Sequence, residues 1–220
     1  MQSVQSVQGM QSEIDAASVV WLHDRQLRER DWPVLSHVPA RVLSNLPAQC
    51  ELWQRIDANH RYNGLLWREE DRARRPDAPP TEIAAGKRLI DRYRQKRNDA
   101  VDAIDEALLA DLARIVCRPD ARLSSETAGA MIHRLSILAL KIHHMRAQTQ
   151  RSDAGDAHVR ACAARFERLV QQRQDLTSCL DALLAEARAG RAYFKVYRQF
   201  KMVNGPAPDP AASASQSAPP

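Results

Sequence analysis

The sequence predicts an all-α protein, an up-down bundle of about five long helices with a short C-terminal helix that closes the bundle. Three observations support this prediction. The dominant residue types are Ala, Leu, Arg, Gln, Asp and Glu, most of which favour helix, and the 220 residues include only seven glycines. Few stretches are rich in β-branched residues. Apolar residues recur at steps of three and four over long segments, which is the period of one helix face.

Proline, glycine and capping residues divide the chain into helices. Pro47 suits a first helical turn, and Pro76 ends that helix. Ser124 and Ser125 are expected to cap a later helix, and Gly190 suits the position just after a helix end. The predicted helices span 13–30, 39–45, 47–75, 81–116, 126–150, 156–188 and 191–202.

The chain is expected to form one domain over 13–204, between a disordered N-terminus (1–12) and a disordered Pro/Ala/Ser-rich tail (205–220). No apolar run approaches the length of a membrane span, and the N-terminus lacks the pattern of a signal peptide. The four cysteines form no C-x-x-C pair, so we expect small buried apolar residues in a reducing compartment. A cytoplasmic location follows.

Charged residues occupy apolar positions of these helices. From Val159 to Ala187, nine positions step by three and four, and Arg173 is the charged one. Because an unpaired buried charge is costly, such residues must pair with one another or line a wet cavity. Structural salt bridges and a ligand pocket both remain open. The pocket would use His60, Asn63, Arg74, Lys87, Arg97, Asn98, Arg134, Lys141, His144, Arg173 and Lys201.

Arginine and lysine in such a pocket suit a phosphate or carboxylate, so we expect an anionic, phosphorylated small molecule as ligand. A net charge of +5 permits such a partner. Both signs are mixed along every helix, and we therefore do not expect nucleic acid to bind. The segment 191–202 alternates aromatic and basic residues, which could bind RNA but better suits an amphipathic closing helix.

Two acidic groups lie on the predicted helices 47–75 and 81–116. Glu70 and Asp71 on the first would face Asp99 and Asp102 on the second if the helices form a hairpin. Paired carboxylates on neighbouring helices can hold Mg²⁺, which would bind a phosphorylated substrate. The alternative is an acidic face that pairs with nearby arginines.

Several strings resemble a bacterial family known as domain of unknown function 4254, over about residues 14–206. The strings are HDRQLRERDWP (23–33), NGLLWREEDRARRPD (63–77), KRLIDRYRQKRNDAVDAID (87–105), ETAGAMIHRLSILALKIHHM (126–145) and VYRQFKMVN (196–204). The resemblance brings no activity with it. It implies a weak link to cell-envelope glycan assembly.

Three functions are consistent with these observations. The first is a cytoplasmic bundle that binds a phosphorylated sugar or nucleotide, in or beside cell-envelope glycan synthesis. The second is a Mg²⁺-dependent phosphohydrolase or transferase. It is similar to all-helical nucleotide pyrophosphohydrolases, although EED-x-x-R and D-x-x-D here depart from their E-x-x-E and E-x-x-D helices. The third is a non-catalytic scaffold for a glycosyltransferase. A homodimer is compatible with each.

Overall fold

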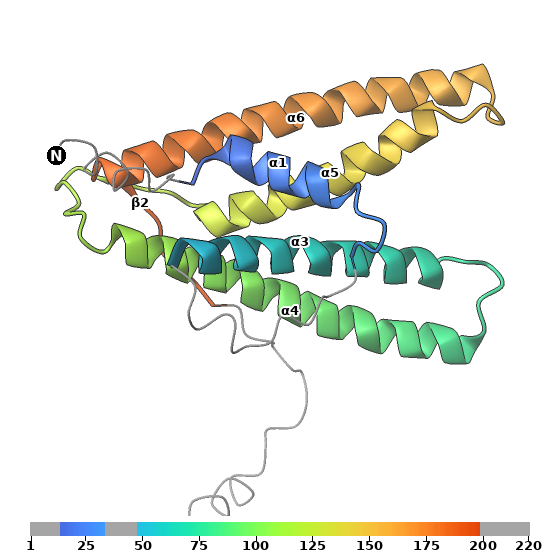
Figure 1. The fold of residues 1–220 in the computed structure, drawn as a ribbon, viewed down its shortest axis with the longest axis horizontal. Helices are drawn as coiled ribbons and strands as arrows, with labels where there is room; N and C mark the ends of the chain where they lie inside the picture. The colour runs from blue at the N-terminus through green and yellow to red at the C-terminus, as the bar shows by residue number, and fades with distance from the viewer. Residues whose placement is uncertain (1–13, 34–47, 199–220) are drawn as a thin grey trace, which may run out of the picture.

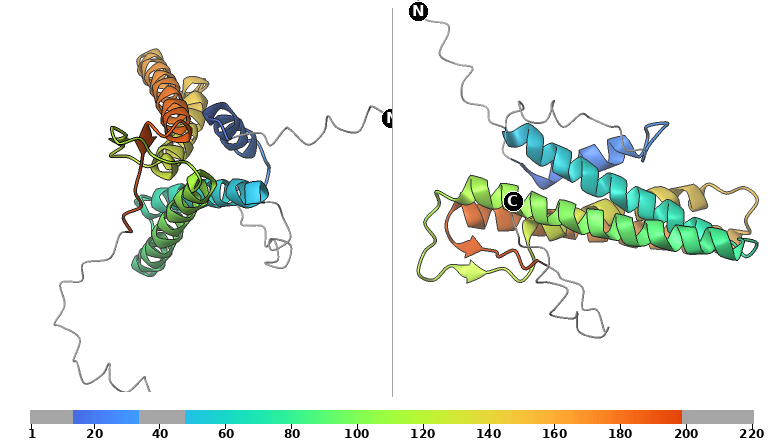
Figure 2. Two further views of the ribbon diagram at one scale, coloured as in Figure 1. Left: turned by 90° about the vertical axis from the view of Figure 1, so that its left-hand side faces the viewer. Right: turned by 90° about the horizontal axis from the view of Figure 1, so that it is seen from below.

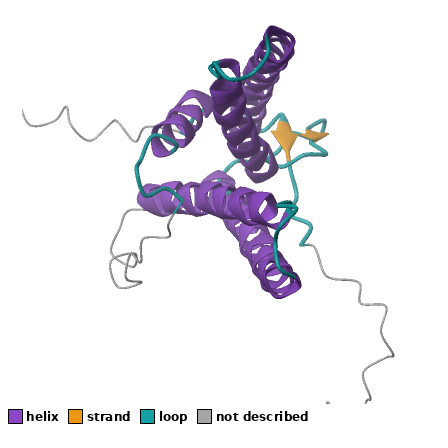
Figure 3. Ribbon diagram, turned by 90° about the vertical axis from the view of Figure 1, so that its right-hand side faces the viewer, coloured by secondary structure: helices purple, strands orange, loops and turns teal. Residues whose placement is uncertain are grey.

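The computed structural model describes residues 14–33 and 48–198, and its described part is almost entirely helical (Figures 1 and 3). The prediction of an all-α bundle is confirmed. Two short strands pair in parallel, with Arg122 beside Ala192 and Leu123 beside Tyr193. The helices are α1 (Ala16–Gln26), α3 (Ala48–Ala73), α4 (Pro80–Leu112), α5 (Ala128–Thr149) and α6 (Asp156–Arg188), and the strands are β1 (Arg122–Leu123) and β2 (Ala192–Tyr193).

The four long helices form two antiparallel hairpins. Helix α3 packs mainly on α4, and α5 packs mainly on α6. The turns of both hairpins lie at one end of the bundle, and the α4–α5 connection lies at the other end with β1 and β2 (Figures 1 and 2). Helices α3 and α5 therefore run in the same direction, and α1 packs against α5, α6 and α3.

Helix α5 supplies the largest share of the core, as its apolar composition predicts. Ten of its residues are buried, including Ile132, Leu135 and Leu140. Helix α6 faces it with the predicted row of apolar residues, of which Cys162, Leu176 and Leu180 are buried. Because α5 contacts α1, α3, α4 and α6, few of its faces reach solvent.

The start of α5 is capped differently from the prediction. Thr127, rather than Ser124 or Ser125, is the capping residue, and its side chain accepts the amide hydrogen of Ala130. The Asp105 carboxylate of α4 accepts hydrogen bonds from the Thr127 hydroxyl and the Gly129 amide, each at 2.6 Å. A negative charge at a helix N-terminus is favourable, so Asp105 stabilises the α4–α5 contact.

The predicted closing helix over 191–202 is wrong for its described part. Gly190, with φ of 68°, ends α6 as expected and turns the chain beside β1. The Arg122 amide then donates to the Arg191 carbonyl at 2.9 Å, and the Ser124 amide to that of Tyr193 at 2.8 Å. Ala192 and Phe194 are buried, whereas Tyr193 between them is only partly buried. This alternation is typical of an extended segment.

The expectation of buried cysteines is wrong for Cys117 and Cys179, which are exposed, and right for Cys162. Exposure follows from their place in the loop after α4 and on the outer face of α6. None of the described helices is long and apolar enough to cross a membrane. The expected helix 39–45, the disordered ends 1–12 and 205–220 and residues 199–202 lie outside the described residues.

Candidate functional site

Polar and aromatic residues line the contact between α3 and α5. The His60 Nδ1 and Ser136 Oγ atoms are 2.7 Å apart, and Asn63 Nδ2 donates to the same hydroxyl at 2.8 Å. One helical turn further along α3, the Trp67 ring lies flat on the ring of His144, with centroids 4.5 Å apart and planes 3° apart. Because α3 and α5 run in the same direction, residues spaced by three or four positions along α3 contact residues of similar spacing along α5.

The buried half of this contact is a network of side-chain hydrogen bonds and ring contacts, here called the imidazole network. Asn63 Nδ2 lies 3.2 Å from His133 Nδ1, and Asn59 Nδ2 donates to the Arg97 carbonyl at 3.5 Å. Fully buried polar side chains are unusual and are normally hydrogen-bonded. The network comprises His23, Asn59, His60, Asn63, His133 and Ser136.

Helix α1 and the segment after it cover one side of the network. The His23 ring centroid lies 4.4 Å from that of His60, and the Trp32 ring lies 4.8 Å from it. The Trp32 ring fits against α3 because residue 64 is glycine: a Cβ atom there would lie 2.2 Å from Trp32 Cη2. Within the described chain, both ring nitrogens of His23, the Nε2 atom of His60 and the Trp32 Nε1 atom have no hydrogen-bond partner.

The three imidazoles are uncharged at neutral pH. Burial lowers the pKa of His60 to about 3, although the nearby His23 backbone acts in the opposite direction. Burial, and then the charge of Arg97, lower the pKa of His133 to about 4. Burial also holds the pKa of His23 well below its ordinary value. The imidazole network therefore contributes hydrogen bonds and shape, and it contributes no positive charge to a ligand.

A cleft of about 600 Å³ opens where α3, α5 and α6 meet, beyond the imidazole network. We call it the cationic cleft. It combines aromatic and apolar side chains with three basic ones and falls in the size range of small-molecule sites. Its lining residues are Trp67, Asp71, Lys141, His144, Met145, Gln148, Arg165, Arg168, Leu169 and Gln172.

The basic residues of the cationic cleft are free. Lys141, Arg165 and Arg168 make no hydrogen bond or ion pair with another described residue. The carboxylate in the lining, Asp71, accepts a hydrogen bond from Arg74 at 3.2 Å. The cleft therefore presents three positive charges that no described residue neutralises.

Several other predicted pocket residues are paired instead. Arg134 lies 2.7 Å from Glu126, Arg173 lies 2.8 Å from Asp24, and Arg74 binds Glu70 as well as Asp71. For Arg134, Arg173 and Arg74 the structure supports the salt-bridge interpretation. Arg173 has a structural consequence, because its bond to Asp24 ties α1 to α6.

Two further predicted cations of the described chain, Arg97 and Lys87, are not among the lining residues of the cleft. Arg97 is half-buried, and its Nη2 and Nε atoms donate to the side-chain Oδ1 atom of Asn98 at 3.0 and 3.2 Å. Burial, and then the charge of Arg94, lower its pKa. Lys87 is exposed on α4, and Lys201 lies outside the described residues. The predicted set therefore divides: His60 and Asn63 join the imidazole network, and Lys141 and His144 line the cationic cleft.

The four predicted metal-binding carboxylates have separate surroundings. Glu70 lies 3.4 Å from both Arg74 and Arg94. Asp99 accepts from Gln95 at 2.8 Å. Burial raises the pKa of Asp102. Among residues 14–33 and 48–198, no group of three or more His, Cys, Asp or Glu side chains is placed to hold a metal ion.

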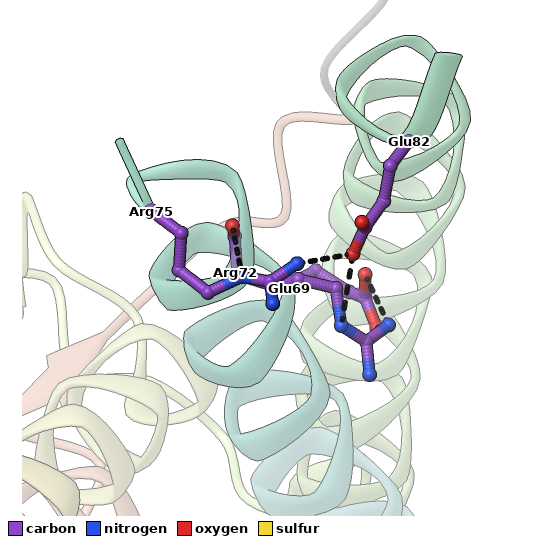
Figure 4. Close-up of polar contacts among 4 residues, drawn as sticks. All are labelled: Glu69, Arg72, Arg75 and Glu82. Carbon is purple, nitrogen blue, oxygen red and sulfur yellow. Dashed lines mark hydrogen bonds and ion pairs between the residues drawn. The ribbon is translucent and has the colours of Figure 1, made fainter. Parts of the chain in front are cut away.

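Arginines bind further carboxylates at the turn of the α3–α4 hairpin (Figure 4). Arg72 lies 3.0 Å from Glu69 of its own helix and 3.9 Å from Glu82 of α4. Arg75 binds Glu82 at 2.6 Å. These contacts join the two helices, so the charge-rich stretch after Trp67 stabilises the α3–α4 hairpin.

Sequence reasoning missed two groups of residues. His23, Asn59, His133 and Ser136 belong to the imidazole network; Ser136 had a usable signal, because it interrupts the apolar run of α5. Arg165 and Arg168 lie outside the apolar row of α6 and resemble ordinary surface arginines in the sequence. Only the position of α3 and α5 beside them shows that they border a cleft.

The fold and the site define an all-helical bundle with a buried polar contact between two parallel helices and a cationic cleft at its end. A family model described as "Protein of unknown function (DUF4254)" matches residues 53–196, more than half of the chain. The chain belongs to this family. Searches of curated proteins and of solved structures each gave no significant match. The matched range contains the whole cationic cleft and excludes α1 with His23.

Proposed function

We propose that this protein binds a phosphorylated, anionic small molecule in the cationic cleft. One observation carries the proposal: Lys141, Arg165 and Arg168 border a cleft of about 600 Å³ and have no ionic partner among the described residues. Phosphate groups are the ligands that arginine binds best, through parallel hydrogen bonds from its planar fork. A sugar phosphate and a nucleotide are both compatible with these charges.

The imidazole network has a positioning role in this proposal. It joins α3 to α5 through Ser136, which accepts from Asn63 and contacts His60. The same helix pair carries Trp67 and His144 into the cleft wall. Buried hydrogen bonds of this kind fix one relative position of two helices, and a fixed wall lowers the entropy lost on binding.

The proposal also covers where in the cell the protein acts and in which process. A cytoplasmic location is supported by three cysteines that are free thiols, Cys117, Cys162 and Cys179. A role beside cell-envelope glycan assembly rests on the family resemblance alone. The binding site itself depends on neither statement.

Isothermal titration calorimetry with pyrophosphate and with uridine diphosphate tests the site. Each charge-assisted hydrogen bond contributes about 1.5–3 kcal/mol, so Arg165→Gln and Arg168→Gln should each weaken binding by about 10-fold or more. Arg160→Gln is the matched control, because Arg160 lies on the same helix, is exposed and is outside the cleft lining. Its affinity should equal that of the parent.

Two results would overturn the proposal. One is that neither compound binds the parent protein at millimolar concentration in low salt. The other is that Arg160→Gln weakens binding as much as Arg168→Gln, since the attraction would then come from the general charge of α6.

A further inference from the structure

We infer that the ligand of the cationic cleft carries a planar heteroaromatic ring, so that the class of ligand is a nucleotide rather than a sugar phosphate. This inference rests on the proposed function and adds the part of the ligand that the three cations leave open. The ring would stack on the aromatic side chains of the cleft wall, and the phosphate groups would bind Lys141, Arg165 and Arg168.

Two aromatic side chains of the cleft lining are stacked, and a third meets one of them edge-on. The Trp67 and His144 rings are parallel within 3°, and the His143 ring meets His144 edge-on with centroids 5.4 Å apart. Trp67 is partly buried, whereas His144 is exposed and lines the cleft. Burial, and then His143, lower the pKa of His144. The His144 ring is thus held flat on a tryptophan, and both rings belong to the lining of the cleft.

The rest of the wall favours a flat apolar group over a hydroxyl-rich one. Met145 and Leu169 lie beside Trp67 in the lining. Trp67, Met145 and Leu169 offer a sugar no acceptor or charged donor, so its hydroxyl groups would lose water against these three side chains without compensation, which is unfavourable. A base stacked on an aromatic side chain gains about 1–3 kcal/mol and needs no hydrogen bonds on its faces.

Two amide side chains complete the arrangement. Gln172 lines the cleft and has no hydrogen-bond partner among the described residues. Gln148 lines the cleft from α5; its Oε1 atom accepts from Arg151 at 3.3 Å, and its amide nitrogen has no partner among the described residues. An amide offers one acceptor and two donors, which match the edge of a base. A simple phosphate would leave both amides unused.

Four compounds separate the parts of the ligand: uridine diphosphate, adenosine diphosphate, ribose 5-phosphate and pyrophosphate, each titrated into the full chain. We expect both nucleotides to bind at least 10-fold more tightly than ribose 5-phosphate. Trp67→Leu and His144→Ala should remove most of that advantage and leave the affinity for pyrophosphate within about 2-fold. His144→Ala keeps the test valid if Trp67→Leu fails to fold, because His144 is exposed.

The outcomes distinguish this inference from the proposed function. If ribose 5-phosphate or pyrophosphate binds as tightly as the nucleotides, and Arg168→Gln weakens all of them, the anion site stands and the nucleotide inference is wrong. The inference is also wrong if His144→Ala weakens nucleotides and pyrophosphate equally. If no compound binds the parent, both proposals are wrong.

Discussion

His60 lies where α1, α3 and α5 meet, and its side chain has no exposure to solvent. Its neighbours in the imidazole network are two further histidines, both with a pKa below the ordinary value. A buried imidazole whose folded pKa is lowered stabilises the fold at a pH above its unfolded pKa of about 6.5. That contribution is lost as the pH falls toward the folded pKa, because the unfolded chain then binds more protons.

Acidification from pH 7 to pH 5 should therefore destabilise the protein. With a pKa of about 3 for His60 and about 4 for His133, the contribution of each to the free energy of unfolding falls by about 2 kcal/mol over this interval, and His23 adds to the loss. Asp105 acts in the opposite direction. Burial raises its pKa to about 6, so its contribution to the free energy of unfolding rises by about 1 kcal/mol as the pH falls. The histidines outweigh it, and urea unfolding should show a net loss of about 3 kcal/mol or more.

Variants assign this pH dependence to the buried rings. His133→Gln removes one of the three and should reduce the difference between pH 7 and pH 5 by about 2 kcal/mol. His143→Gln is the control, because His143 is exposed at the surface of the same helix. Equal pH dependence in the parent and in His133→Gln would show that the network does not titrate as described.

At the scale of single helices, two glycines should respond to substitution with opposite sign. In Gly64→Ala the new Cβ atom would lie 2.2 Å from the Trp32 ring and 2.9 Å from Pro33. Overpacking of this kind costs about 1–3 kcal/mol and more than cancels the gain of alanine in a helix. In Gly86→Ala the nearest atom is 3.9 Å away, so the helix gain of about 1 kcal/mol should remain.

Thermal unfolding of both variants measures this difference. At about 2–4 °C per kcal/mol for a chain of this size, Gly64→Ala should melt below the parent and Gly86→Ala above it. A shift of the same sign in both would mean that the Trp32 ring does not occupy the space beside residue 64.

Helix boundaries were predictable where a local residue determines them. The predicted helix over 156–188 is confirmed at both ends, with Gly190 in the left-handed conformation after it. The α5 cap was missed because Thr127 is selected by Asp105, a residue of another helix. The closing helix was wrong because β2 forms on a partner strand, β1, which is nearly 70 residues away in the chain. Contacts between distant segments leave no local pattern to find.

The site was predictable to a similar extent. His60, Asn63, Lys141 and His144, which the sequence marked by their positions in otherwise apolar rows, lie in the polar contact or the cleft of the structure, and their role in ligand binding stays a prediction. The sequence offered no way to tell them from Arg134 and Arg173, whose carboxylate partners are supplied by other parts of the fold. Pairing is a property of the assembled bundle, so the choice between salt bridge and binding residue requires the structure.

For the molecule as a whole, α1 should open before the four long helices. It has 11 residues and packs less extensively against each of its neighbours than the two helices of each hairpin pack against one another. Its fastenings include the Arg173–Asp24 pair and the hydrogen bond from the Ala16 amide to Asp181 at 2.8 Å. Hydrogen exchange followed by mass spectrometry should show faster exchange in α1 than in α5 at pH 7. Equal protection of both helices would contradict this order.

The α3–α4 and α5–α6 hairpins follow one another in the chain. The α4–α5 loop joins them at one end, where β1 pairs with β2 and the Gly190 carbonyl accepts the Arg118 amide at 2.9 Å. At the other end lie the two separate turns of α3–α4 and α5–α6 (Figure 1). The cationic cleft takes lining residues from α3 of one hairpin and from α5 and α6 of the other. The imidazole network holds α3 against α5, so we expect the two walls of the cleft to keep their spacing and a ligand bound between them to contact both hairpins.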